Sequence, residues 1–216
     1  MATSRQRTDP IRADLIDAGI RLLAEQGAHA LVMRRVAAAA DVSTMCVYSR
    51  FGDKAGLLDA VYLTGFERLE TAMTAANTVP EPLTRVMDLA LAYRSFALEN
   101  PALYSLMFER MMGFDPPVEL RATALGTTFS LVESAMTEAA DTGVIEVASP
   151  QTAAYQVWTT AHGAVSLELI HATQSQLPGW FIDSPHSGER VFRQVLETTL
   201  RGMAPSGQSV DRGLTG

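Results

Sequence analysis

The sequence has a single cysteine among its 216 residues, Cys46, and no uncharged apolar run long enough to cross a bilayer. One thiol excludes a disulfide framework within the chain, and a membrane-spanning helix needs a run of about 18 apolar residues. The first residues, Met1–Thr8, contain no apolar signal-peptide core. Extensive disorder is excluded as well, because 47% of the residues are hydrophobic. These absences predict a soluble, cytoplasmic protein.

Proline and strand-like patterns are also scarce. No proline occurs between Pro10 and Pro80, and no stretch alternates apolar with polar residues over the length of a strand. The segments between the prolines are rich in Ala, Leu, Met and Glu, which favour helices. Asp9 followed by Pro10 is typical of a helix start, and Gly27 of a helix end. We therefore predict an all-α fold of about nine helices, at roughly 10–26, 33–40, 44–51, 54–77, 82–99, 101–112, 117–141, 150–175 and 186–203.

Charge is distributed unevenly along the chain. The net charge is −7, yet residues 1–55 carry eight basic and six acidic side chains, against nine and eighteen in the remainder. Such an asymmetry is typical of a protein in which one domain, the head, binds nucleic acid and the rest of the chain, the body, has another function. We expect a nucleic-acid-binding domain at 1–55, a separate domain at 56–203, and a disordered tail at 204–216. The arm Met1–Thr8, with its two arginines, is expected to be disordered in the free protein; it either tracks DNA or is an idle tail.

The segment Met33–Leu58 carries the most specific pattern. Two short helices joined by a turn are predicted there, as in a helix-turn-helix. Ala37 supplies the small side chain that lets the helices cross closely, and Asp41 is one of the few residues besides glycine that tolerate a left-handed turn. Ser43 can cap the second helix. The apolar residues that would lock the two helices together are Val36, Val42, Val47 and Phe51.

The same segment resembles the recognition-helix signature of tetracycline-repressor (TetR) type transcriptional regulators. The matching residues are Val-Ser-Thr-Met-Cys-Val-Tyr-Ser-Arg-Phe at 42–51, followed by Asp53-Lys54 and Leu57-Leu58. The resemblance implies a three-helix DNA-binding head at 1–55, an effector-binding and dimerisation domain at 56–203, and a homodimer that binds a palindromic operator. Its two recognition helices would enter successive major grooves, with half-site centres roughly 34 Å or a small multiple apart.

The signature has three departures in this chain. Asp41 stands where the turn glycine is usual, Met45-Cys46 replaces a common Gly/Pro-Thr pair, and Arg50 occupies a position where His or Tyr is common. Side chains on the recognition helix read base edges. The departures therefore bear on the operator sequence more than on the fold.

Contacts with DNA are implied by the place of each residue in the signature. Residues two to five positions into the recognition helix are expected to read base edges, and Tyr48 and Lys54 to bind phosphate. The plainer alternatives are that Tyr48 packs in the head and that Lys54 or Arg50 is only solvated. A redox role for Cys46 is left open. The full set of predicted DNA-binding residues is Arg34, Ser43, Thr44, Met45, Cys46, Tyr48, Ser49, Arg50 and Lys54.

A second, shorter resemblance lies in the body. Trp158–Gly163 is similar to the Trp-x3-His-Gly element of one TetR C-terminal domain subfamily. His162 and His171 are nine positions apart, whereas metal ligands on a helix prefer spacings of three or four, so we expect no metal and no cofactor. Aromatic and Met side chains of the body are core residues by default, but some must line any effector cavity. The predicted lining of a pocket for a hydrophobic or aromatic small molecule is Phe96, Tyr104, Met107, Phe108, Phe129, Trp158 and His162.

The last two long helices are expected to form the dimer interface, as a four-helix bundle with their symmetry mates. The stretch 161–164 consists of small residues and one histidine, which allows close helix approach, and the final helix carries an apolar stripe. The predicted interface residues are Ala161, Gly163, Val191, Val195, Leu196 and Thr199.

Three function classes compete. The leading hypothesis is a ligand-responsive, DNA-binding regulator, and a repressor more than an activator. An enzyme is disfavoured, because the sequence has no nucleophile with a plausible base, no paired-carboxylate motif and no phosphate-binding glycine loop. An architectural DNA binder without an effector is disfavoured by the large acidic body, which DNA binding alone does not need.

Overall fold

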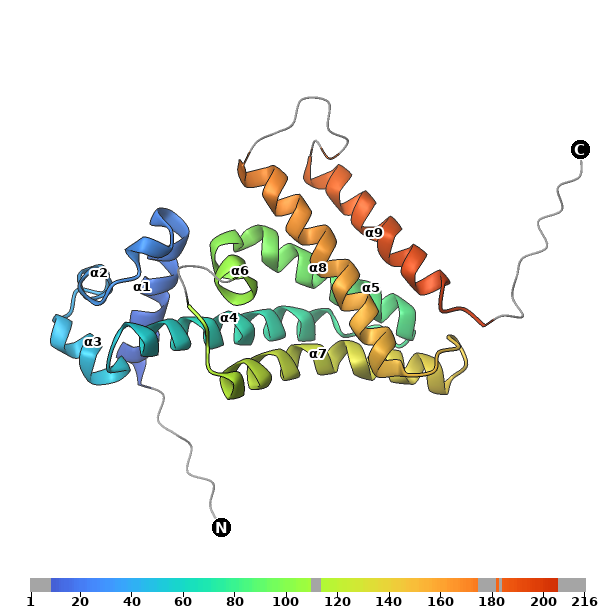
Figure 1. Ribbon diagram of the computed structural model, residues 1–216, viewed down its shortest axis with the longest axis horizontal. Coiled ribbons are helices and arrows are strands. Elements are labelled where there is room, and N and C mark those ends of the chain that lie inside the picture. The colour runs from blue at the N-terminus through green and yellow to red at the C-terminus, as the bar shows by residue number, and fades with distance from the viewer. Residues whose placement is uncertain (1–8, 110–113, 175–181, 183, 206–216) are drawn as a thin grey trace, which may run out of the picture. The chain divides into compact units, whose positions relative to one another are not determined.

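The structure is built from α-helices (Figure 1). The computed structural model describes residues 9–109, 114–174, 182 and 184–205, and these residues contain no strand. The helices are α1 (Pro10–Gln26), α2 (Met33–Ala39), α3 (Thr44–Phe51), α4 (Lys54–Ala76), α5 (Pro82–Glu99), α6 (Pro101–Phe108), α7 (Val118–Asp141), α8 (Pro150–Gln174) and α9 (Pro185–Arg201), with one 3₁₀ turn, η1 (Ala28–Ala30). The predicted all-α fold is confirmed. No described helix is both long and apolar enough to span a membrane.

Predicted and observed helix ends agree to within two residues, with one exception. The sequence predicts α6 to residue 112, but the helix ends at Phe108 because Glu109 has an extended backbone, with φ −103° and ψ 148°. The 3₁₀ turn η1 is not predicted from the sequence, and it buries Ala28 and Ala30. The predicted arm 1–8 and most of the predicted tail, 206–216, lie outside the described residues.

The chain divides into two compact units, which we call the head unit and the body unit. The head unit comprises Met1–Arg68 and Glu99–Leu125, and the body unit Leu69–Leu98 and Gly126–Gly216. The prediction divides the chain once, at residue 55. Each observed unit instead combines two separate stretches of the chain. Two helices, α4 and α7, have several residues in each unit, and α5 has its last residue, Glu99, in the head unit.

Capping residues explain where α1 begins and ends. The Asp9 Oδ1 atom accepts hydrogen bonds from the backbone N–H groups of Ile11, at 3.1 Å, and Arg12, at 3.3 Å. Pro10 occupies the first helical position, where its missing N–H group has no cost. Gly27 ends the helix with φ +76°, a left-handed conformation that favours glycine. The predicted start and end signals are therefore confirmed.

The helix-turn-helix of the head unit consists of α2 and α3, which pack on each other and on α1 (Figure 1). Val36, Ala37 and Val47 are buried between these helices. Asp41 has φ +52° and is the one non-glycine residue with a positive φ in the described part of the chain. Ser43 caps α3, because its Oγ atom accepts the backbone N–H of Cys46 at 3.2 Å. The turn chemistry predicted from the sequence is therefore confirmed.

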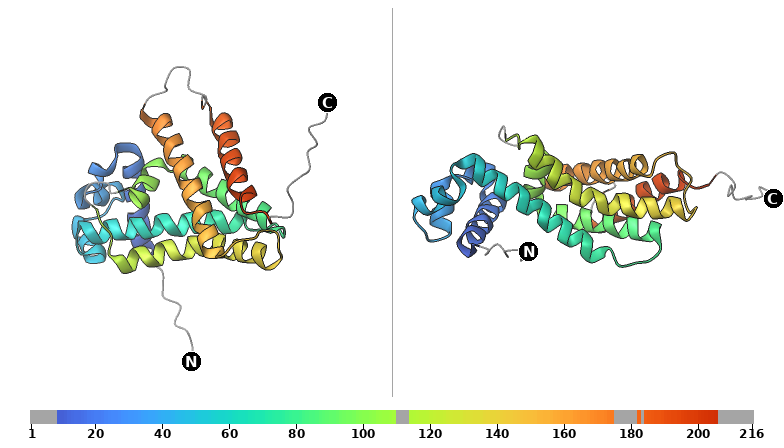
Figure 2. Two further views of the ribbon diagram at one scale, coloured as in Figure 1. Left: turned by 45° about the vertical axis from the view of Figure 1, so that its right-hand side comes forward. Right: turned by 90° about the horizontal axis from the view of Figure 1, so that it is seen from below.

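In the body unit, α8 and α9 lie side by side (Figure 2). A buried ion pair joins α5 to α8: Arg94 Nε donates to Glu168 Oε2 at 2.8 Å, and Arg94 Nη2 donates to Oε1 at 2.6 Å. The Nη2 atom also donates to the backbone carbonyl of Pro185 at 2.8 Å. Gly188 lies against the same pair, because a Cβ atom there would come within 2.1 Å of Glu168 Oε1. One arginine thus fixes the start of α9 against two other helices.

Candidate functional site

The recognition helix α3 has one buried and one exposed face. Val47 and Phe51 are 0% and 8% exposed, and they fasten α3 to the rest of the head unit. Met45 and Tyr48, on the opposite side, are 74% and 47% exposed. The helix therefore presents a side-chain surface that the fold itself does not use.

The predicted DNA-binding residues fall into two groups by exposure. Those that are exposed are Arg34, Ser43, Met45, Tyr48 and Ser49, and those that are half-buried are Thr44, Cys46, Arg50 and Lys54. All but Arg34 and Lys54 belong to α3 or its cap.

The start of α4 lies next to this surface. Asp53 Oδ1 accepts the backbone N–H of Gly56 at 2.9 Å and so caps the helix in which Lys54 is the first residue. Gly56 lies tightly against the end of α3, because a Cβ atom there would come within 2.1 Å of the Phe51 carbonyl oxygen. The glycine therefore allows a close junction of α3 and α4, which places Lys54 beside the recognition helix.

Arg50 has protein partners that the sequence does not reveal. Its Nε atom donates to Asp9 Oδ2 at 2.8 Å, and its Nη1 atom donates to the Cys46 carbonyl oxygen at 3.2 Å. Burial raises the pKa of Asp9, but the hydrogen bonds from Arg50 and from the backbone of Arg12 and Ile11 outweigh it, and the net pKa is lowered. The sequence identifies Asp9 only as a helix cap, and no sequence signal points to Arg50 as its partner.

Four of the predicted effector-binding residues lie in the body unit. The Tyr93 hydroxyl and His162 Nδ1 are 2.9 Å apart and share a hydrogen bond between α5 and α8. Trp158 lies between His162 and Phe129, with ring centroids 6.1 Å and 6.2 Å away respectively. Phe96, on α5, is buried. Tyr93 is a member of this cluster that the sequence analysis did not single out.

The other three predicted effector residues belong to α6 in the head unit. Tyr104 and Met107 are buried, and Phe108 is half-buried. The Phe108 ring lies 4.8 Å from the ring of Tyr104 and 5.3 Å from that of Phe66 on α4. These side chains pack α6 against α4. Three of the seven predicted pocket residues therefore lie in the head unit and four in the body unit.

The predicted dimer residues also differ in exposure. Ala161 and Leu196 are 3% and 0% exposed, because they pack inside the protomer, so a partner molecule cannot reach them. Gly163 and Val195 are exposed, and Val191 and Thr199 are half-buried. Thr199 Oγ1 lies 3.3 Å from Thr160 Oγ1 and joins α9 to α8.

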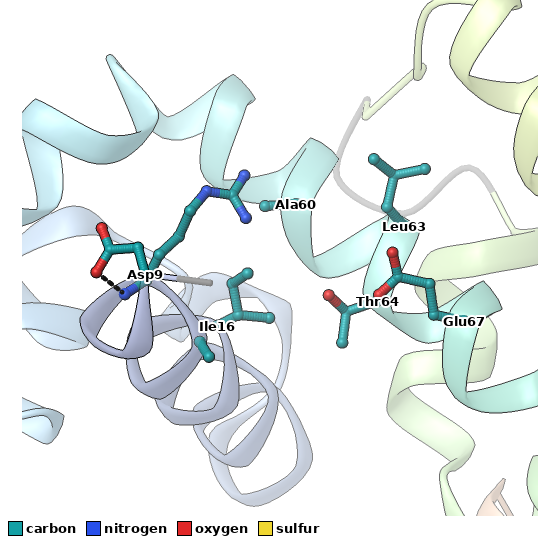
Figure 3. Close-up of a pocket in the computed structure, with 8 residues that line it drawn as sticks. Asp9, Ile16, Ala60, Leu63, Thr64 and Glu67 are labelled. Carbon is teal, nitrogen blue, oxygen red and sulfur yellow. Dashed lines mark hydrogen bonds between the residues drawn. The ribbon is translucent and has the colours of Figure 1, made fainter. Parts of the chain in front are cut away.

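Two clefts are lined entirely by residues that the structure describes, and these residues do not include the predicted effector residues. Figure 3 shows the first, a cleft of about 300 Å³ in the head unit, where Asp9 and Ile16 of α1 face Leu63 and Glu67 of α4. The second, of about 490 Å³, runs along one polar face of α7 between residues 130 and 141. Within the described ranges, no three His, Cys, Asp or Glu side chains lie close enough together to hold a metal ion.

An all-helical chain with a capped helix-turn-helix and an exposed recognition helix is a DNA-binding protein of the helix-turn-helix class. Two family descriptions match the sequence: "Bacterial regulatory proteins, tetR family" over residues 15–61, and "Tetracyclin repressor-like, C-terminal domain" over residues 86–199. The chain belongs to the TetR family of transcriptional regulators. None of the curated proteins compared with it matches.

Solved structures share the fold over nearly the whole chain. A protein of unknown function from Rhodococcus sp. RHA1 is 26% identical, with a TM-score of 0.76 over 94% of this chain and 100% of that one. The fatty acid degradation regulator FadR from Bacillus halodurans is 15% identical, with a TM-score of 0.71 over 90% and 97%. A tetR-family regulatory protein from Rhodococcus RHA1 is 23% identical, with a TM-score of 0.63 over 91% and 98%.

Proposed function

We propose that this transcriptional regulator is a repressor, which binds a palindromic operator as a homodimer and leaves it when a small, mainly apolar effector binds. The observation that carries the DNA-binding part is the surface of α3, where Met45 and Tyr48 are exposed while Val47 and Phe51 are buried. A two-turn helix with this arrangement fits the major groove.

Base reading and phosphate binding are divided between neighbouring residues in this proposal. Thr44, Met45 and Ser49 contact base edges, and Tyr48 binds a phosphate through its hydroxyl group. Lys54 binds a second phosphate, which is also favoured by the N-terminus of α4. Thr44 and Lys54 are half-buried, and the other three are exposed.

A second copy of the chain is the proposed partner of α8 and α9. Tyr155, Leu167 and Ile170 on α8 and Val195 on α9 are exposed large hydrophobic side chains. One face of α8 consists of residues that follow helical spacing, at positions 155, 159, 163, 166 and 170. Gly163 is on that face, with no atom within 4 Å of the place of a Cβ atom, and would allow close approach of a symmetry mate.

The dimer is tested by sedimentation at micromolar concentration. We expect a dimer for the unmodified chain and a monomer for Ile170→Glu, because the charge would be buried in the bundle. Glu197→Gln changes an exposed position of α9 and serves as the control that stays dimeric. A chain that sediments as a monomer yet binds a palindrome tightly contradicts the proposal.

The proposed effector site is the body-unit cluster around His162. Trp158 and Phe129 supply aromatic surface, and the hydrogen bond between His162 and Tyr93 supplies a polar anchor that a ligand can compete for. Such a mostly apolar site with one polar group suits a hydrophobic or aromatic molecule. α4 belongs to both units, so an effector-induced change in the body unit can reach the head unit through one continuous helix.

Selection from a random DNA duplex library tests the DNA-binding function. We expect a palindrome among the selected fragments and an affinity that falls steeply with salt. Fragments without symmetry and without a shared sequence would favour the architectural alternative. No retained duplex would leave the enzyme alternative, which a survey of small-molecule turnover would then address.

The effector function is tested by a screen of apolar compounds for a change in Trp fluorescence. A compound that binds must weaken operator binding, and the operator must weaken compound binding by the same factor. We expect His162→Ala to lower the affinity for the compound. Binders that are all strongly hydrophilic, or that leave operator affinity unchanged, contradict the proposal.

A further inference from the structure

The first turn of α1 is bound to the last turn of the recognition helix. Both carboxylate oxygens of Asp9 are engaged: Oδ1 caps α1 by accepting the N–H groups of Ile11 and Arg12, and Oδ2 accepts the Nε–H of Arg50 at 2.8 Å. Figure 3 shows Asp9 at the start of α1, with the capping hydrogen bond drawn as a dashed line. One carboxylate therefore ties the beginning of α1 to α3.

The other end of the Arg50 guanidinium is fastened to its own helix. The Nη1 atom donates to the Cys46 carbonyl oxygen at 3.2 Å and lies 2.9 Å from the Cys46 Sγ atom. The Arg50 side chain is only 22% exposed. A planar guanidinium that is held by partners on two helices keeps a fixed orientation, which a flexible ammonium group would not.

A second contact acts between the same two turns. The Arg12 guanidinium lies over the Phe51 ring, 5.0 Å from its centroid, within the range of a cation–π interaction. Asp9 and Arg12 are three positions apart and therefore share a face of α1, while Arg50 and Phe51 are consecutive on α3. Two independent interactions thus fix the C-terminal end of α3.

The orientation of α3 depends on such contacts. With eight residues it is far shorter than a helix that is stable by itself in water, so packing must hold it in place. A small rotation about its axis would move every side chain on the exposed face relative to the base edges. Direct readout requires donor and acceptor atoms within hydrogen-bond distance, so it is sensitive to such a rotation.

We propose that Asp9 and Arg50 are positioning residues, which set the orientation of the recognition helix through their ion pair, and that Arg50 does not itself contact DNA. This inference rests on the proposed operator binding. It differs from the prediction that Arg50 binds a phosphate or a base, because the guanidinium is already paired with a carboxylate and oriented toward α1.

The test is operator affinity as a function of salt for four proteins: the unmodified chain, Asp9→Ser, Arg50→Ala and the double variant. Serine caps a helix about as well as aspartate, but it is too short and uncharged to replace the ion pair. We expect each single change to weaken operator binding about tenfold, as the loss of one good base contact would. The salt slope should stay unchanged, because no phosphate contact is lost. The double variant should be no weaker than either single variant.

A matched control uses the same substitution on the same helix. Asp17 on α1 forms a different, exposed ion pair, with Arg68 at 2.5 Å, which does not involve α3. Asp17→Ser is expected to leave operator affinity within about twofold of the unmodified value. Thermal unfolding of each variant shows whether it is folded, and Asp9→Asn, which keeps a capping oxygen, replaces Asp9→Ser if that variant is unstable.

The competing role of Arg50 gives opposite results. If Arg50 bound a phosphate, Arg50→Ala would lower the salt slope by about one. Asp9→Ser would then strengthen binding, because it frees the guanidinium and removes a negative charge near DNA. Either result, or additive losses in the double variant, overturns the inference. Failure of the unmodified chain to select any duplex would instead refute the proposed operator binding itself.

Discussion

The head unit and the body unit use their polar residues in opposite ways. In the head unit, Tyr48 and Ser49 of α3 are exposed, and the hydrogen bond that caps this helix, from the Cys46 N–H to Ser43 Oγ, is local. In the body unit, the Arg94–Glu168 pair is buried and joins residues 74 positions apart. A surface that recognises a partner can be encoded in a short continuous motif. A polar network inside a core is assembled from distant segments.

The largest expected effect comes from breaking the buried pair of the body unit. Glu168→Leu removes the hydrogen-bonded carboxylate of the buried Arg94 guanidinium and leaves only the half-exposed Glu189, whose Oε2 atom lies 3.9 Å from Arg94 Nη1. We expect the free energy of unfolding to fall by about 3–5 kcal/mol. Urea unfolding monitored by circular dichroism measures it. Replacing both residues, with Arg94→Met and Glu168→Leu, should recover most of the loss, because no unpaired charge then remains.

An exposed ion pair provides the control for this experiment. Arg201 Nη2 and Glu197 Oε2 lie 2.9 Å apart on α9, with 77% and 47% of their side chains exposed. Glu197→Gln should change the free energy of unfolding by less than about 0.5 kcal/mol. If Glu168→Leu also changed the free energy of unfolding by less than about 0.5 kcal/mol, the buried pair would not stabilise the body unit.

The second largest effect is expected at the junction of α3 and α4 in the head unit. Gly56→Ala would place a Cβ atom 2.1 Å from the Phe51 carbonyl oxygen, which is backbone and cannot move freely. We expect a loss of about 1–3 kcal/mol, measured by thermal unfolding. Gly126→Ala on α7 is the matched change, since no atom lies within 4 Å of its Cβ position. There alanine should stabilise the helix by about 0.5–1 kcal/mol.

A smaller effect, seen in binding and not in stability, is expected at Lys54. Lys54→Ala should weaken binding to all duplex sequences by about the same factor and lower the salt slope by about one. Fluorescence anisotropy with the selected operator and a scrambled duplex, at several salt concentrations, measures both quantities. A change in sequence preference at an unaltered slope would mean that Lys54 reads bases and does not bind phosphate.

The smallest effect is the acid dependence of the Asp9–Arg50 pair. The pKa of Asp9 is lowered from its ordinary value of 3.8. A carboxyl with a lowered pKa in the folded state stabilises the fold above the pKa of the unfolded chain, and this contribution is lost as the pH falls through the folded-state pKa. The difference in Tm between the unmodified chain and Asp9→Ser should therefore be constant at neutral pH and shrink below pH 3.8. A difference that grows on acidification contradicts the lowered pKa.

Much of the head unit follows from local rules. The helix caps at Asp9 and Ser43 and the left-handed turn at Asp41 are confirmed by the structure, because each depends on atoms within a few residues. The exposed face of α3 follows from helical periodicity in the same way. The partners of Arg50 do not, since Asp9 is 41 positions away and only the packing of α1 against α3 brings the two together.

The sequence predicts fewer of the contacts in the body unit, because these contacts also join residues that are far apart in the chain. The aromatic residues proposed as one pocket lie in two units, because α6 packs against α4 in the head unit while α5, α7 and α8 supply the cluster around His162. Ala161 and Leu196 fit an interface by size and spacing, yet they are buried within the protomer. Periodicity identifies an apolar stripe, but it does not say whether the stripe faces its own chain or another copy.

The amino-acid sequence by itself determined the positions of the helices, their caps and the helix-turn-helix, and with them the family to which the chain belongs. These features depend on backbone hydrogen bonds and side chains that are close in the chain, so each segment specifies them independently of the rest. The tertiary structure alone decided that Arg50 pairs with Asp9, that Arg94 and Glu168 share a buried ion pair, and that Tyr93 shares a hydrogen bond with His162. Such pairings depend on how the helices pack against one another. This packing is set by the joint burial of apolar faces from several helices, so no single segment specifies it.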